Sequence, residues 1–175
     1  MAVLVRELAQ RLGAGPFVEV CTDLLGGADR EHHLGALPYL TGHSFADAAP
    51  ARDPRRWPDL WVRTWGARGL LHVWDDSATP AVVAGLGDEH WRPAEMCLKV
   101  VARHDVAGAG DASAALLSHE LARVRAQALR ALAVVGDTEH VEQVRDLVED
   151  SDEQVRGQAQ RALTRMTARL DIAAG

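Results

Sequence analysis

The sequence is poor in cysteine, lysine and aromatic residues, and it lacks any long apolar run. Its two cysteines, Cys21 and Cys97, are too few for a disulfide framework and favour a reducing compartment. No stretch reaches the ~20 apolar residues of a membrane helix, and Arg6, Glu7 and Arg11 stand where a signal peptide would be apolar. We therefore expect a soluble, cytoplasmic protein with no membrane partner.

Catalytic and metal-binding motifs are also absent. The sequence has no Gly-rich phosphate loop, no Ser-His-Asp order and no HExxH motif. His32 and His33 with His43 come closest to a metal-binding set, but their spacing matches no common one. Cys97 and His104 fall on one helix face, where a buried thiol and a buried histidine are the simpler interpretation than a zinc or nucleophile pair. We expect no cofactor and no metal site, and the sequence favours a non-catalytic protein.

Charge of one sign is not in large excess. The 175 residues include 19 basic and 25 acidic side chains, a net charge of −6, so the whole chain is not a polycation that would seek nucleic acid. Lys99 is the single lysine, so nearly all the basic groups are guanidinium groups. A hydrophobic fraction of 47% argues against disorder and suffices for a buried core.

What the sequence does have is a period of 31 residues. Residues 124–132, VRAQALRAL, return 31 positions later as VRGQAQRAL. We number each repeat from position 0, which falls on Arg63, Ala94, Arg125 and Arg156. Positions +3 and +6 are mostly small and position +7 is aliphatic: Gly66, Cys97, Ala128 and Ala159; Gly69, Val100, Ala131 and Ala162; Leu70, Val101, Leu132 and Leu163. Such columns allow a helix to pack closely on the equivalent helix of the next unit, which is typical of an α-solenoid.

The predicted fold is therefore all-α, a right-handed superhelix of about five helical hairpins in a single repeat domain, residues 1–175. Residues 1–42 are degenerate N-terminal helices and a cap, 43–57 an irregular connection, 58–170 the regular repeats and 171–175 a frayed tail. Helices are expected at 2–12, 17–25, 31–40 and 58–74. In the regular part, first helices are expected at 80–86, 111–118 and 139–149, and second helices at 91–104, 121–135 and 153–170.

The segments 59–63 (DLWVR) and 152–156 (DEQVR), with the alanine and leucine columns behind them, resemble HEAT repeats. They are most similar to the type of about 30 residues found in phycobilisome lyases. The resemblance covers residues 58–170 and, more weakly, 16–41. It implies that Asp59, Arg63, Asp152 and Arg156 form ion pairs along the stack of repeats.

Two departures from the HEAT pattern fall in the middle of the chain. Ala94 stands where the family has arginine, and Leu121 stands where it has the aspartate that precedes Val124 and Arg125. The resemblance therefore implies that the series of Asp–Arg pairs is interrupted there.

One side of the second helices is basic. Positions −2, +2, +5 and +9 lie opposite the apolar columns on a helical wheel, and in a HEAT-like stack this side lines the concave groove. Eight of these sixteen positions are basic and none is acidic. The predicted binding residues, called here the basic face, are Arg68, Lys99, Arg130 and Arg161 at +5, Arg92 and Arg123 at −2, Arg103 and Arg165 at +9, and Trp61 and Trp65.

The basic face and the two tryptophans each have a simpler interpretation. Arginine is a good helix former, so the basic face could be an ordinary solvated surface. Residues 42–56 could fold over Trp61 and Trp65, whereas an exposed aromatic patch would mark a binding site.

The leading functional hypothesis is a scaffold or adaptor whose basic groove binds an acidic protein or another anionic partner. The alternative is a nucleic-acid-binding protein related to the HEAT-like alkylpurine DNA glycosylases. That alternative requires a carboxylate, Asp59 or Asp75, beside Trp61 and Trp65. A third possibility, a lyase-like chaperone for a tetrapyrrole, depends on the family resemblance alone.

Overall fold

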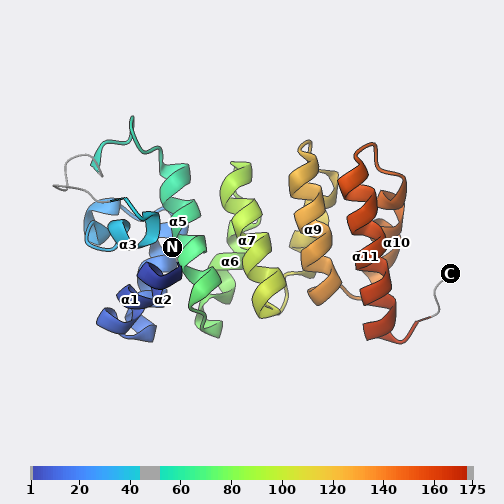
Figure 1. Ribbon diagram of the computed structural model, residues 1–175, viewed down its shortest axis with the longest axis horizontal. Helices are drawn as coiled ribbons and strands as arrows, with labels where there is room; N and C mark the ends of the chain where they lie inside the picture. The colour runs from blue at the N-terminus through green and yellow to red at the C-terminus, as the bar shows by residue number, and fades with distance from the viewer. Residues whose placement is uncertain (1, 44–51, 173–175) are drawn as a thin grey trace. The chain divides into compact units, whose positions relative to one another are not determined.

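The computed structural model describes residues 2–43 and 52–172, and every regular element in these ranges is a helix (Figure 1). The prediction of an all-α fold is confirmed. The chain forms two compact units, residues 1–96 and 97–175, and each is described by itself. None of the described helices is both long enough and apolar enough to cross a membrane.

Unit 1 begins with two helices that agree with the predicted ones at 2–12 and 17–25. Its elements are α1 (Ala2–Leu12), α2 (Ala14–Leu25), η1 (Arg30–His33), α3 (Leu37–Thr41), α5 (Asp59–His72), η2 (Asp76–Ala78), α6 (Thr79–Gly85) and the first turns of α7 (Trp91–His104). α5 packs against α2 and α3, so the degenerate N-terminal part covers the first regular helix.

The single helix predicted at 31–40 is wrong. The Asp29 side chain accepts the Glu31 N–H and starts the short turn η1, and the separate helix α3 follows after Gly35 with Pro38 in its first turn. Proline lacks the N–H that a continuous helix would need, and glycine weakens a helix interior. Gly42 ends α3 in the left-handed conformation at φ 74°. Residues 44–51, most of the predicted connection, lie outside the described ranges.

Unit 2 holds the most regular repeats. It contains the rest of α7, then α8 (Gly110–Ala115), η3 (Leu116–Ser118), α9 (Ala122–Val135), η4 (Thr138–His140), α10 (Val141–Asp146), η5 (Leu147–Glu149) and α11 (Glu153–Leu170). α9 and α11 lie side by side, α8 packs on α9, and α10 packs on α11 (Figure 1). The second helices have the predicted bounds to within a residue, whereas the first helices are short α-helices with 3₁₀ turns at their ends.

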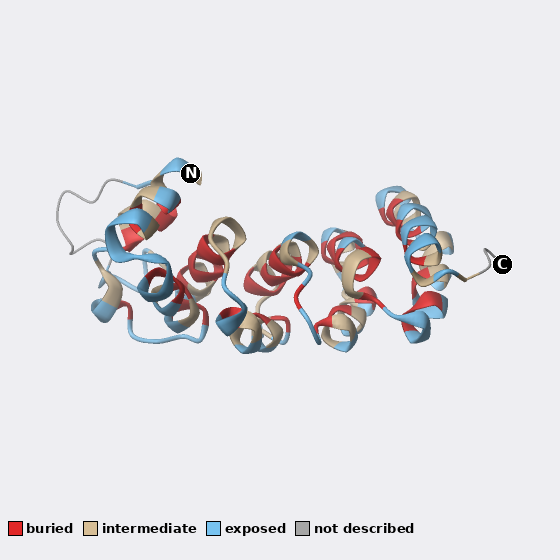
Figure 2. Ribbon diagram, turned by 90° about the horizontal axis from the view of Figure 1, so that it is seen from below, coloured by how far each residue is buried: buried red, intermediate tan, exposed pale blue. Residues whose placement is uncertain are grey.

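The buried residues lie between the helices of each pair, as Figure 2 shows. Every residue at positions −1, +3 and +6 is buried, as the repeat period predicts. The small residues are needed where helices come closest. A Cβ added to Gly66 would lie 2.5 Å from the Cys21 carbonyl oxygen, and one added to Gly69 would lie 2.3 Å from the Cys21 Sγ. Glycine therefore allows α5 to approach α2.

At the other end of the chain, α11 closes with Asp171 in the left-handed conformation and a hydrogen bond from Ile172 N–H to the Thr167 carbonyl. Residues 173–175, part of the predicted frayed tail, lie outside the described ranges.

Candidate functional site

Two of the arginines at position 0, Arg63 and Arg125, are neutralised by aspartates. Arg63 donates from Nε and Nη2 to the two carboxylate oxygens of Asp88, at 2.6 and 3.0 Å. Arg125 makes the same bidentate contact with Asp150, at 2.8 and 2.7 Å. These hydrogen bonds raise the pKa of both guanidinium groups, and the bond from Arg125 lowers the pKa of Asp150. Arg63 and Arg125 therefore stabilise the repeats and are not available to a ligand.

The pairing implied by the HEAT resemblance is only partly correct. Asp59 does pair with another segment, since it accepts from Arg30, but Arg63 binds Asp88. Asp152 caps α11 by accepting the N–H groups of Gln154 and Val155. Arg156 donates to the carbonyls of residues 150 and 151 and forms no ion pair among the described residues.

The series of Asp–Arg pairs is interrupted at one repeat, where the sequence analysis missed that the partner of the arginine is also replaced. Asp88 and Asp150 each accept the N–H two residues ahead, and the equivalent residue of the intervening repeat is His119, whose Nδ1 accepts the Leu121 N–H. Ala94 lacks the arginine of that repeat and His119 lacks the carboxylate, so both partners of the ion pair have been replaced together. The N-terminal cap is kept while the ion pair is lost.

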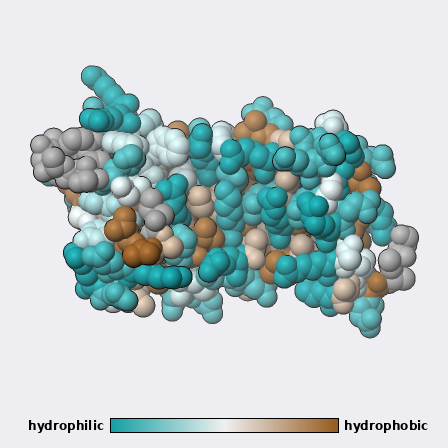
Figure 3. All heavy atoms as spheres, viewed as in Figure 1, coloured by the Kyte–Doolittle hydropathy of each residue, from teal (hydrophilic) through white to brown (hydrophobic). Residues whose placement is uncertain are grey.

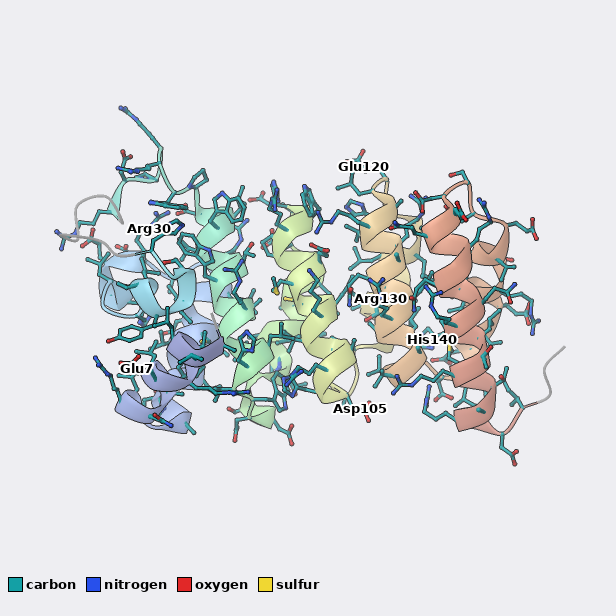
Figure 4. All side chains as sticks on the ribbon, viewed as in Figure 1. Glu7, Arg30, Asp105, Glu120, Arg130 and His140 are labelled. Carbon is teal, nitrogen blue, oxygen red and sulfur yellow. The ribbon has the colours of Figure 1, made fainter. Side chains whose placement is uncertain are left out.

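Most of the basic face reaches the surface. Arg103, Arg123, Arg130, Arg161 and Arg165 are exposed. Trp61, Arg68, Arg92 and Lys99 are half-buried. The space-filling view shows mostly hydrophilic residues over α9 and α11 on the side turned to the viewer (Figure 3), and Arg130 lies on that side of α9 (Figure 4).

The prediction that Trp65 belongs to a binding surface is wrong. Its side chain is 4% exposed, and its ring meets that of Trp57 edge-on, with centroids 5.2 Å apart. His43 lies against Trp57 in turn, at 5.1 Å, so Trp57 covers Trp65, whereas most of residues 42–56, the segment expected to cover both tryptophans, lies outside the described ranges.

Position +2 is buried more generally, with Gln127 5% and Gln158 7% exposed. In unit 2, α9 and α11 contact each other along their sides, so the open face is narrower than the polar half of a helical wheel. Trp65 occupies the same position of its own repeat.

In unit 2 two buried glutamine side chains accept hydrogen bonds from two exposed arginines. Gln127 Oε1 accepts from Arg130 Nη1 at 3.0 Å. Gln158 Oε1 accepts from Arg161 Nη2 at 3.0 Å and from its Nε at 3.3 Å. A neutral amide orients each guanidinium group without neutralising its charge.

The surface beside these arginines carries charges of both signs. A shallow depression of about 1100 Å³ is lined by Arg130, Arg156 and Arg161 and also by Glu149 and Glu153. The acidic side chains come from η5 and the first turn of α11. The depression therefore offers a ligand several cations with acidic groups at one rim.

In unit 1, Arg68 and Trp61 differ in their surroundings. Burial lowers the pKa of the Arg68 guanidinium, and no described residue gives it a hydrogen bond or an ion pair. The Trp61 ring is covered on one side by Arg92, whose Cζ lies 4.6 Å from the ring centroid. Sequence reasoning missed the second aromatic partner of Arg92, the adjacent Trp91.

Neither aspartate proposed for the glycosylase alternative is free for chemistry beside the tryptophans. Asp59 accepts from Arg30, and Asp75 accepts the Ser77 N–H as the cap of η2. The hydrogen bonds from Ser77 lower the pKa of Asp75, so this carboxylate is held in its charged form.

One group of side chains in unit 2 has the composition of a metal site but the hydrogen bonds of a helix cap. Ligand atoms of Asp111, Glu139 and His140 lie within 4.8 Å of one another. The Asp137 N–H donates to His140 Nδ1 at 2.9 Å, so the neutral ring carries its proton on Nε2, 3.1 Å from an Asp111 oxygen. The lone pair that a metal would need on Nε2 is therefore occupied.

The pairing of a short helix with a long one in each repeat agrees with the proteins to which this chain is similar. The sequence of residues 110–174 matches the family of HEAT repeats. This part of the chain is therefore similar to HEAT repeats. The whole chain is an all-α repeat protein consistent with a HEAT solenoid.

Two crystal structures of engineered proteins from the Northeast Structural Genomics Consortium are similar in fold. One superposes with a TM-score of 0.57 at 20% identity, over 96% of this chain and 86% of that one. The other has a TM-score of 0.53 at 18% identity, over 97% of both chains. At these identities the likeness concerns the fold alone. No curated protein matches the sequence.

Proposed function

We propose that this protein is a non-catalytic scaffold that binds an acidic segment of a partner protein on the basic face of its second helices. HEAT repeats generally serve as protein-interaction scaffolds, and unrelated functions recur on such folds, so the argument depends on the residues of the face.

The observation that carries the proposal is the difference between two sets of arginines. Arg63 and Arg125 each have an aspartate as a bidentate partner. On the basic face, Arg130 and Arg161 contact only a glutamine amide. In the described part of the chain, no hydrogen bond or ion pair involves the side chains of Arg68, Arg92, Arg103 and Arg165. In a protein with a net charge of −6, the uncompensated cations on the second helices of each unit attract an anionic ligand.

The buried glutamines support a binding role in preference to an ordinary solvated surface. A free arginine side chain loses rotamer freedom when it binds a ligand. Gln127 and Gln158 already restrict Arg130 and Arg161, so less entropy is lost on binding. The same contact recurs in two successive repeats, which gives a partner two equivalent anchors.

An acidic protein segment fits this surface better than nucleic acid does. Glu149 and Glu153 line the same depression as Arg130 and Arg161, and they would repel a continuous phosphate backbone. A protein segment can place acidic residues against the arginines and neutral or basic residues against the glutamates. Trp65 is buried and cannot stack on a base.

We also propose that residues 1–175 act as one repeat domain in the cytoplasm. The period of 31 residues supports the phycobilisome-lyase type of HEAT repeat as the origin of the array. The absence of disulfide pairing between the two buried cysteines is compatible with that compartment.

The test is to compare the binding of poly-L-glutamate and of single-stranded DNA by calorimetry over a range of salt concentrations. The proposal predicts that polyglutamate binds more tightly than DNA of similar length, and that its affinity falls as salt rises. Tighter binding of DNA would move the protein to the nucleic-acid alternative. No binding of either polymer at low salt would leave the basic face as a solvated surface.

A further inference from the structure

Four planar side chains lie close together at the N-terminal end of α7. The Arg92 Cζ lies over the Trp61 ring, 4.6 Å from its centroid, and over the Trp91 ring, 4.4 Å from its centroid. Trp91 stacks on His90 in turn, with centroids 5.9 Å apart and an interplanar angle of 24°. All four residues belong to unit 1 and are half-buried, and the guanidinium group of Arg92 contacts two indole rings.

The contacts with the two rings leave the N–H donors of this guanidinium group unused. A cation–π contact supplies no oxygen or nitrogen acceptor, so the in-plane N–H donors stay available to one. Among the described residues, no acceptor is hydrogen-bonded to these donors; the hydrogen bond from Arg92 to His90 Nδ1 is made by the backbone N–H. A planar donor fork with fixed orientation matches the two oxygens of a carboxylate.

We propose that Arg92, clamped by Trp61 and Trp91, is a receptor for a single carboxylate of the acidic partner. The inference rests on the proposed function and adds a specific anchor to it. The two indoles restrict the guanidinium group before the ligand arrives, and their apolar surface reduces the exposure of the contact to water. Arg92 therefore selects a side-chain or C-terminal carboxylate that can approach in the guanidinium plane.

The acidic side chain of Glu89 favours a carboxylate over a phosphate as the ligand of Arg92. Glu89 stands three positions before Arg92 with its side chain 87% exposed, and its contact with Arg63 is long, at 3.5 Å. Arg63 itself is already neutralised by Asp88. A phosphomonoester carries up to two negative charges near neutral pH, and each is repelled by Glu89, whereas a carboxylate carries one.

The experiment is an NMR titration of the full chain labelled with ¹⁵N, using sodium acetate or sodium phosphate at constant ionic strength. The reporters are the Arg92 Nε–H and the indole N–H groups of Trp61 and Trp91, assigned by single Trp→Phe variants. Acetate is expected to shift these signals saturably, and phosphate to bind more weakly. Arg92→Lys keeps the charge but not the planar fork and should bind acetate roughly tenfold more weakly.

Arg6→Ala is the matched control, because Arg6 is an exposed arginine outside the basic face, without a stacked ring among the described residues; it should leave the acetate titration unchanged. Trp61→Leu removes one clamping ring without altering a charge and should give an intermediate affinity if Arg92→Lys fails to fold. Tighter binding of phosphate, equal affinity of wild type and Arg92→Lys, or no saturable shift with either anion would overturn the proposal.

The failure of this inference is distinguishable from that of the proposed function. If polyglutamate binds while the Trp61 and Trp91 signals stay silent, the scaffold proposal holds and the Arg92 receptor does not. If acetate shifts these signals but polyglutamate does not bind, the receptor exists without the scaffold function.

Discussion

Replacing Arg125 with alanine should destabilise unit 2 far more than replacing Arg130, five residues along the same helix. Arg125 donates two charge-assisted hydrogen bonds to Asp150, and the two side chains are 14% and 10% exposed. It also donates to the carbonyls of His119 and Glu120. The substitution leaves the Asp150 carboxylate nearly buried, with the Asp152 N–H as its remaining donor.

The magnitude follows from the cost of leaving a buried charge unpaired. Removing one partner of a buried ion pair costs about 3 to 5 kcal/mol, and the slight exposure of this pair points to about 3 kcal/mol for Arg125→Ala. Arg130→Ala loses one hydrogen bond to a neutral amide at an exposed position, which is worth about 1 kcal/mol or less. For a chain of this size the first change lowers the melting temperature by roughly 6 to 12 °C.

The assay is urea unfolding followed by far-UV circular dichroism, with hydrogen exchange of α9 and α11 amides to detect local opening. The pH dependence gives a second check. Because hydrogen bonding from Arg125 lowers the pKa of Asp150 in the folded state, the stabilisation is complete above the unfolded pKa of about 3.9 and is lost as pH falls through the folded value. Equal effects of the two substitutions, or a difference that persists in strong acid, would refute the reasoning.

Three further predictions concern a close contact between helices and the access of reagents to two buried side chains. Gly66→Ala should destabilise unit 1 by about 2 kcal/mol or more in urea unfolding, because its Cβ would meet the backbone of Cys21 and Leu25, whereas Gly157→Ala in α11 should be neutral or stabilising by up to about 1 kcal/mol. Burial raises the pKa of the Cys21 thiol well above its usual range, so iodoacetamide should modify it only in denaturant. Trp65→Phe should raise the fraction of the remaining fluorescence that acrylamide quenches, since Trp65 is buried and its own emission is protected from the quencher.

The repeat period predicted the core well because packing imposes the same demand at the same position of every repeat. Small residues recur at +3 and +6, and Gly66 and Gly69 prove to lie where two helices come closest. The bounds of α9 and α11 followed from the same register. The helix predicted at 31–40 failed because the local signals of Asp29, Gly35 and Pro38 outweighed the apolar pattern.

The candidate site was predicted less completely because a helical wheel does not show which side chains are covered by other parts of the chain. In unit 2, position +2 points between α9 and α11, and in unit 1 Trp57 covers Trp65, so these residues are buried although they lie on the polar half of the wheel. The ion pairs were missed because arginine and its partner are 25 residues apart, as in Arg63–Asp88, and the aspartate lies in the turn before a later helix. The role of Trp91 was invisible because it lies just outside the repeat columns.

The most direct test of the central claim is the affinity of polyglutamate for the double variant Arg130→Glu and Arg161→Glu. Both side chains are exposed, so the fold should be retained, and the matched control, Arg6→Glu with Arg145→Glu, makes the same change in net charge away from the basic face. The account predicts a loss of about tenfold or more in affinity for the first variant and little change for the control. Equal losses in the two variants would show that polyglutamate responds to net charge alone, and the basic face would then have no specific role.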